Sequence, residues 1–255
     1  MIKGTVVLSK LEFDVLWESE KLPAKHEALT VPSPGRTHTE RRRLVARAFA
    51  DLERRGLAER ERAVPDLVDQ LNLLAHHQLA IDSWVWTDHR ISSLAVVAGS
   101  TALLCAVDGP EVWLIPARET SIAAAAVSIA GEVIAGPGRS VSVPTDVLGA
   151  ADAEARGDAR AFAASLTNKG IAGTDAKTMA DMVRDMNVRG QFCVTRLQRD
   201  QRMVRADRVV AFHDTPRGRY VHLAKPNNDG RMWSTVTPAD SRRLASCVQE
   251  LMAEV

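Results

Sequence analysis

The chain has 255 residues, of which 45% are hydrophobic and 25% are charged, a composition typical of a folded globular protein. Its 33 Lys and Arg residues balance 32 Asp and Glu residues, so there is no basic field of the kind that attracts nucleic acid or anionic membranes. The three cysteines, Cys105, Cys193 and Cys247, lie far apart, which fits a reducing compartment and neither a disulfide framework nor a metal site.

No apolar stretch approaches the roughly 20 residues that a membrane helix needs. The nearest is the alanine-rich segment 121–130. The apolar start of the chain meets Glu12 and Asp14 before a signal-peptide core can form. We therefore expect a cytoplasmic protein without membrane insertion.

The first part of the chain has helical periodicity. A short helix is predicted over residues 9–18, and Thr37 with Glu40 forms a capping-box pattern for a helix through Arg55. Another helix begins at Pro65. The arginines at 41–43, 54, 55 and 60 alternate with acidic residues, which favours the solvated face of a helix over a phosphate-binding patch.

The period then becomes that of strands. Short apolar runs separated by Asp and Gly turns predict an antiparallel meander over residues 81–86, 91–97, 102–107 and 112–115. An alanine-rich helix is expected from about residue 120 to 133.

The second part repeats this order. A strand at 140–143 leads into a helix at Thr145, followed by a helix at 159–166 and a helix at 175–186 with Thr174 as its N-cap. Strands are expected at 191–197, 208–213, 220–224 and 232–236, and Asp240 opens a last helix. The sequence thus predicts an α+β protein of two pseudo-repeated halves, 1–135 and 136–255, which join near Gly136 in one quasi-two-fold domain.

Motifs for catalysis are scarce. No histidine pair has the spacing of a zinc protease, and residues 136–140 lack the ending of a phosphate loop, so we expect neither a metal nor a cofactor. His213 and Asp214 stand at a strand end, where a turn explains them as well as catalysis does. An alternative remains open, in which the protein is a small-molecule enzyme whose pocket between the halves gathers His213, Asp214 or Cys193.

Met179, Met182 and Met186 fall on one face of a predicted helix. A methionine stripe at helical spacing either packs into the core or adapts to a partner helix. The pattern alone does not decide between these two roles.

Several motifs in the same order resemble the EspG family of ESX (type VII) secretion-associated proteins of actinobacteria. The resemblance rests on residues 214–220 (DTPRGRY) and 233–240 (WSTVTPAD). In the first half it extends to residues 7–9, 13–17 and 31–37, and it also includes 138–144 and 189–192.

The resemblance implies a chaperone, not an enzyme, in which helical bundles flank a central antiparallel sheet. It further implies that the protein binds a PE/PPE-like pair of helical secreted proteins for the ESX machinery, while the choice between monomer and homodimer stays open. We expect the partner-binding surface at Met179, Met182, Met186, Asn187, Arg189 and Gln191.

Overall fold

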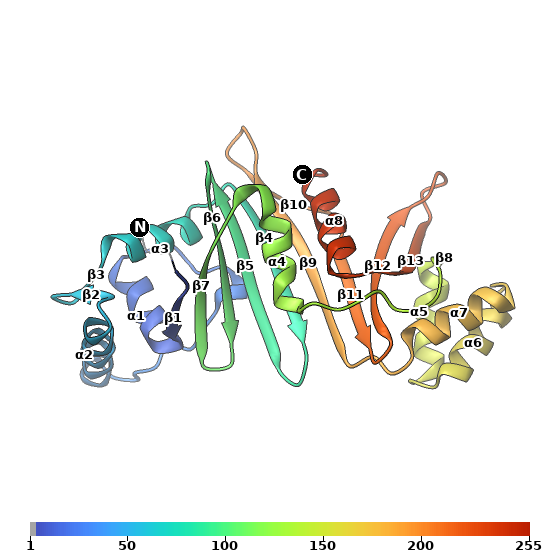
Figure 1. Ribbon diagram of the computed structural model, residues 1–255, viewed down its shortest axis with the longest axis horizontal. Coiled ribbons are helices and arrows are strands. Elements are labelled where there is room, and N and C mark those ends of the chain that lie inside the picture. The colour runs from blue at the N-terminus through green and yellow to red at the C-terminus, as the bar shows by residue number, and fades with distance from the viewer. Residues whose placement is uncertain (1–3) are drawn as a thin grey trace. The chain divides into compact units, whose positions relative to one another are not determined.

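A computed structural model describes residues 4–255, and it divides the chain into two compact units. Unit 1 contains Met1–Trp84, His89–Ile129 and Thr195–Val204, and unit 2 contains Val85–Asp88, Ala130–Val194 and Arg205–Val255. Both units combine helices with antiparallel strands (Figure 1), which confirms the predicted α+β class.

The strands of unit 1 form a meander with one added strand at its end. Their order is β1-β7-β6-β5-β4. They span β1 (Val6–Ser9), β4 (Leu79–Trp86), β5 (Arg90–Ala98), β6 (Thr101–Asp108) and β7 (Glu111–Ala117). The last two residues of β4, Val85 and Trp86, belong to unit 2. A separate two-stranded sheet contains β2 (Ala58–Glu59) and β3 (Arg62–Ala63).

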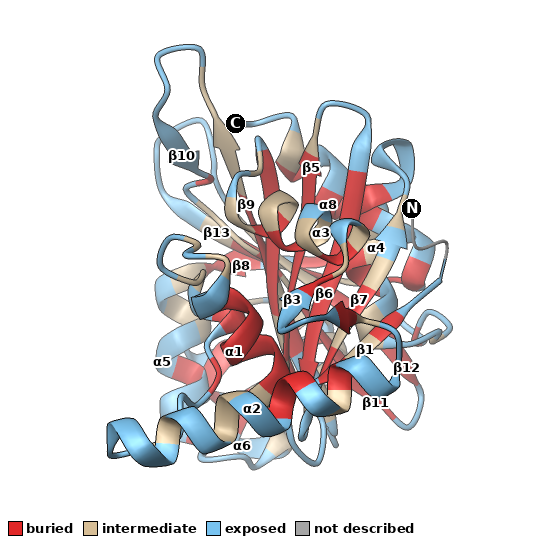
Figure 2. Ribbon diagram, turned by 90° about the vertical axis from the view of Figure 1, so that its left-hand side faces the viewer, coloured by how far each residue is buried: buried red, intermediate tan, exposed pale blue. Residues whose placement is uncertain are grey.

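The helices of unit 1 are α1 (Lys10–Ser19), α2 (His38–Arg54), α3 (Pro65–Ala75) and α4 (Ile122–Val127). Ser9 and Glu12 form a full capping box at the start of α1, and Pro65 occupies the first turn of α3. The helix α1 is largely buried, whereas α2 buries only Ala48, Phe49 and Leu52 and exposes the opposite side (Figure 2).

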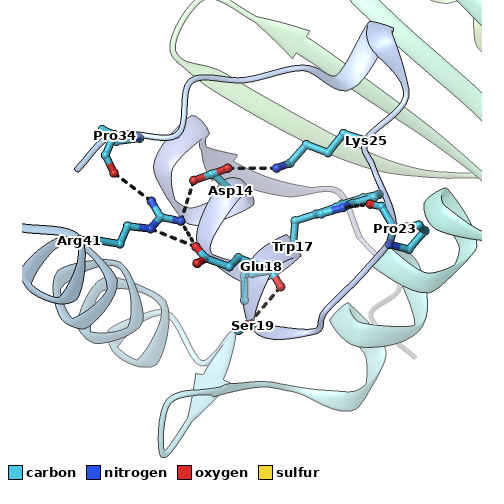
Figure 3. A network of polar contacts seen from close by, with 9 residues as sticks. Asp14, Trp17, Glu18, Ser19, Pro23, Lys25, Pro34 and Arg41 are labelled. Atoms are coloured by element: carbon cyan, nitrogen blue, oxygen red, sulfur yellow. Dashed lines mark hydrogen bonds and ion pairs between the residues drawn. The ribbon is translucent and has the colours of Figure 1, made fainter. Parts of the chain in front are cut away.

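Arg41 of α2 attaches that helix to α1 (Figure 3). Its guanidinium donates to Asp14 Oδ2 at 2.8 Å and also contacts Glu18, while Lys25 Nζ lies 3.0 Å from Asp14 Oδ1. Arg55 donates in turn to Glu12 Oε1 at 3.1 Å. The prediction of a solvated arginine face is therefore wrong for Arg41, whose side chain is partly buried between carboxylates of α1, whereas Arg55 remains exposed while it contacts Glu12.

Unit 2 repeats the scheme. Its strand order is β9-β11-β12-β13-β8. The short strand β10 (Met203–Arg205), of which only Arg205 belongs to unit 2, pairs with β9. The other strands are β8 (Val141–Pro144), β9 (Val188–Leu197), β11 (Val210–Thr215), β12 (Gly218–Pro226) and β13 (Met232–Pro238). The helices are α5 (Thr145–Ala155), α6 (Ala159–Asn168), α7 (Gly173–Val183) and α8 (Ser241–Met252).

The two units share their order of elements. In each unit an edge strand precedes the helices and pairs with the last strand of the meander, as β1 does with β7 and β8 with β13. This order matches the predicted duplication. Superposition of the halves 1–135 and 136–255 within one domain stays a prediction.

Two helices have boundaries that differ from the predictions. The alanine-rich helix ends at Val127 and continues only as a 3-10 turn over Ser128–Ala130, because Gly131 then adopts a φ of +71°. The helix α7 begins at Gly173 after Ala172, without a side-chain cap, so Thr174 is not its N-cap. Its end at Val183 is fixed by extended Arg184 and by Asp185, whose φ is +60°.

Across residues 4–255, none of the helices combines the length and the apolar character required to span a bilayer.

Candidate functional site

The six residues expected to bind a partner separate into core and surface. Met179 is 0% exposed and Met182 is 1% exposed, and both belong to the hydrophobic core that α5, α6 and α7 form with β8, β12 and β13. The core alternative is therefore correct for these two residues, and a continuous methionine surface stripe is excluded. Because α7 ends at Val183, Met186 lies outside the helix and is 54% exposed.

The connection from α7 to β9 orients the four remaining residues. The positive φ of Asp185 turns the chain, and the Asn187 N–H donates to Asp214 O at 3.0 Å, which fixes the start of β9 beside β11. Met186 therefore lies between a turn at Asp185 and a backbone hydrogen bond at Asn187, and its apolar side chain is exposed to solvent. We call Met186, Asn187, Arg189 and Gln191, with Trp86, Ala211 and His222, the Met186 surface.

One face of the unit 2 sheet supplies this surface. The register places Gln191 beside Ala211, Ala211 beside His222, and His222 beside Val236. The first three are half-buried, whereas Val236 is 3% exposed because it packs in the core formed with α5, α6 and α7. The helices therefore cover the β13 end of this row and leave the β9 end accessible.

Two polar groups of the Met186 surface have unusual surroundings. The Arg189 guanidinium lies 5.8 Å from the centre of the Trp86 ring, an arrangement typical of cation–π contact. The His222 Nε2 atom is buried and has no hydrogen-bond partner within the described residues. Burial, together with nearby His213, lowers the pKa of His222 and favours the neutral ring. A neutral imidazole can donate to or accept from a partner group.

A groove of about 340 Å³ borders Met186. Phe162 and Val183 supply apolar lining, and Asp152, Asp158 and Asp185 supply carboxylates. Such a mixture suits an apolar side chain flanked by a cationic or N–H donating group.

The side chains proposed for catalysis serve separate structural contacts. His213 Nε2 lies 3.0 Å from Met182 O, and the Asp214 carboxylate bonds Arg219. The two side chains point to opposite faces because they are neighbours on β11. The buried Cys193 thiol lies 3.9 Å from the carbonyl oxygens of Ala206 and Arg208. This arrangement provides no nucleophile and base within hydrogen-bond distance of each other.

Sequence reasoning missed Trp86, Ala211 and His222. Each lies on a strand and can be placed on a face by alternation, but only the pairing register joins them to Gln191 and Arg189. The complete set of surface residues could therefore be identified only once the strand pairing was known.

Comparison with known proteins gives a family match and a fold match. The EspG family model matches residues 9–250. The fold is similar to that of the type VII secretion system chaperone EspG5 of Mycobacterium tuberculosis, solved in complex with a PE25–PPE41 dimer. That match has a TM-score of 0.77 at 11% identity and covers 98% of this chain and 96% of EspG5. No curated protein sequence matches.

The family match includes nearly all of both units, and the motifs at residues 214–220 and 233–240 lie inside it. The chain therefore belongs to the EspG family.

Proposed function

We propose that the protein is a cytoplasmic chaperone of type VII (ESX) secretion, without enzymatic activity, which binds a PE/PPE-like helical dimer and holds it for the secretion machinery. The observation that carries this proposal is the fold likeness, along nearly the whole chain, to EspG5, which was solved with a PE25–PPE41 dimer. The proposal allows either a monomer or a homodimer as the state of the free protein before it binds cargo.

The Met186 surface is the proposed cargo contact. Exposed Met186 offers a flexible thioether that can adapt to an apolar helix tip, and the adjoining groove gives that tip a place to pack. Asn187, Arg189, Gln191 and His222 surround it with donors and acceptors that can fix the orientation of the cargo. Covering an apolar helix tip would keep the cargo from self-association.

Co-purification tests the proposal. The chaperone is co-expressed with candidate PE/PPE-like pairs, and the wild type is compared with Met186→Glu and Gln191→Glu. Burial of an unpaired carboxylate in the interface costs several kcal/mol, so both variants are expected to lose cargo. The melting temperature should stay within about 2 °C, because both positions are accessible in the free protein.

Arg160→Glu is the matched control, since Arg160 is exposed on α6 and outside the Met186 surface. It should retain cargo. Normal cargo binding by folded Met186→Glu and Gln191→Glu would remove this surface from the proposal. Absence of binding to any PE/PPE-like pair by the wild type would contradict the chaperone function itself.

A further inference from the structure

The outer side of α2 carries three arginines that have no carboxylate partner. Arg42, Arg43 and Arg47 are exposed (Figure 2), and within residues 4–255 the structure gives none of them an ion pair. The remaining arginines of α2 and of its C-cap each bond a carboxylate, namely Arg41, Arg54 and Arg55. In a chain whose net charge is only +1, the three outer arginines form a local excess of positive charge. A local field of this kind attracts an anionic partner.

The acidic residues nearest to these arginines along α2 are engaged elsewhere. Glu40 lies three residues before Arg43, and Glu40 Oε2 accepts the Arg36 N–H at 2.9 Å. Asp51 lies four residues after Arg47, and its carboxylate bonds the arginine three residues further on. Both spacings permit an ion pair along a helix. Within α2, the outer arginines are therefore left without an opposite charge.

The spacing of the arginines suits another helix. Arg43 and Arg47 are four residues apart, so they are neighbours on one side of α2, about 6 Å apart along its axis. Ala46 follows Arg43 by three residues and Arg42 by four, so arginines flank this short, exposed side chain on both sides. A guanidinium offers paired N–H groups that fit a carboxylate bidentately. The free cost of holding like charges at this spacing is removed when carboxylates lie opposite them.

Carboxylates limit the extent of this positive surface. Glu40 and Glu53 are exposed, one before and one after the three arginines along α2. Nucleic acid or an anionic membrane would extend over these carboxylates and be repelled by them. A second copy of α2 would bring arginines against arginines. A short helix with carboxylates four residues apart contacts the positive part alone, in matching register.

We propose that Arg42, Arg43 and Arg47 bind an acidic α-helix of a partner protein, in which Glu or Asp residues repeat at a spacing of four. The site lies within unit 1 and shares no residue with the Met186 surface. It does not depend on the cargo function.

Fluorescence anisotropy with the full-length protein tests this. The probe is a labelled, capped, alanine-based peptide of about 16 residues, long enough to be helical alone, with Glu at every fourth position. One control peptide carries Gln in place of Glu, and a second has a central Pro that breaks the helix. We expect saturable binding of the Glu peptide and at least about tenfold weaker binding of both controls. Raising the salt from about 0.05 M to about 0.5 M should weaken binding, because exposed charges are screened.

Three variants separate charge from geometry. Arg43→Gln/Arg47→Gln should weaken binding about tenfold or more. The control is Arg118→Gln, at an exposed position of unit 1 outside α2, which should change binding by less than about twofold. Arg43→Lys/Arg47→Lys retains both charges but loses the paired N–H groups, so it should weaken binding about threefold. All these positions are exposed, so the melting temperatures should stay within about 2 °C of the wild type.

Contrary results are equally specific. Equal binding of the Glu and Gln peptides, or unchanged binding by Arg43→Gln/Arg47→Gln, would overturn the proposal. Equal binding of the Pro peptide would refute recognition of a helix. Heparin or phosphatidylglycerol vesicles binding more tightly than the Glu peptide, with the same loss in Arg43→Gln/Arg47→Gln, would identify a polyanion surface instead. Cargo co-purification should be unchanged in all α2 variants, so this proposal and the chaperone function fail separately.

Discussion

Arg219 and Asp214 form a buried bidentate ion pair. Nε and Nη2 of Arg219 donate to the two carboxylate oxygens of Asp214 at 2.7 and 2.9 Å, and the arginine is 0% exposed. The remaining N–H groups donate to Ala130 O, Gly131 O and Ser241 Oγ. All five donors of the guanidinium are thereby satisfied. The pair joins β11 and β12 to residues 130–131 and to the start of α8.

Arg219→Met is expected to destabilise the protein by about 3–5 kcal/mol, because it leaves the buried Asp214 carboxylate without its cation. Arg217→Met is the control, since Arg217 is exposed two residues earlier. Urea unfolding followed by circular dichroism measures the difference. Equal stability of the two variants would contradict a structural role for the buried pair.

Met182 and Met186 should respond in opposite ways to the same substitution. Met182→Glu places a carboxylate in the core of unit 2 and should lower the stability by several kcal/mol or prevent folding. Met186→Glu should leave the melting temperature nearly unchanged because Met186 is 54% exposed. Thermal unfolding distinguishes them. A normal melting temperature for Met182→Glu would show that α7 can release this side chain.

The sequence could predict most elements because periodicity and turn chemistry are local signals. Pro65 and Asp240 marked helix starts correctly, whereas Thr174 did not, because α7 begins one residue before it without a side-chain cap. Met182 is buried and Met186 is exposed because α7 ends between them. The positive φ of Asp185 prevents the helix from continuing to Met186.

Contacts between distant residues had no sequence signal. Arg219 bonds Ala130 and Gly131, and Arg41 bonds Asp14, so neither role follows from spacing. His222 joins the Met186 surface only through the strand register. The family motif at residues 214–220 supported the family resemblance but did not predict the structural role of each side chain, such as the ion pair between Asp214 and Arg219.

Arg41→Ala should loosen α2 from α1. Burial opposes ionisation of Asp14, but hydrogen bonds from Lys25, Ser33 and Arg41 outweigh it and hold the pKa of Asp14 below its ordinary value. Loss of Arg41 removes one of these partners and should cost about 1–3 kcal/mol. Arg43→Ala, at an exposed position of α2, should cost less than about 0.5 kcal/mol. Denaturant unfolding checks this, and similar costs for the two variants would refute it.

Stability should fall on mild acidification. Burial lowers the pKa of His213 and outweighs the opposing effects of Met182 O and Asp214. A His with a lowered folded pKa stabilises the fold fully above its unfolded pKa of about 6.5, and that contribution is lost as the pH falls toward the folded pKa.

His213→Gln removes this titration and should reduce the drop in melting temperature between about pH 7.5 and pH 5.5. His222 and His77, whose pKa values are also lowered by burial, should maintain part of the dependence. His89→Gln, at an exposed position, serves as the control. An unchanged pH profile for His213→Gln would exclude His213 as a source of acid sensitivity.

Gly136 is a position where a single added methyl group should destabilise the fold. The Gly136 N–H donates to Arg219 O at 3.0 Å, and Ala135 forms an isolated β-bridge with Arg219. These contacts hold residues 135–136 against β12. A Cβ atom at 136 would overlap the Tyr220 ring, with Cε2 only 2.6 Å away. Tyr220 cannot move aside easily, because it is fully buried, its hydroxyl donates to Pro137 O at 3.0 Å, and its ring stacks on His213.

Gly136→Ala should therefore destabilise the protein by about 1–3 kcal/mol through overpacking. Gly149→Ala is the matched control, because a Cβ there meets no atom within 4 Å. Gly149 lies inside α5, and glycine is the poorest helix former apart from proline. Gly149→Ala should therefore raise the free energy of unfolding by about 0.5–1 kcal/mol. The two substitutions add the same methyl group with opposite expected signs. Urea unfolding of both variants measures that difference, and a Gly136→Ala protein as stable as the wild type would mean that the chain at residues 135–137 can shift away from Tyr220.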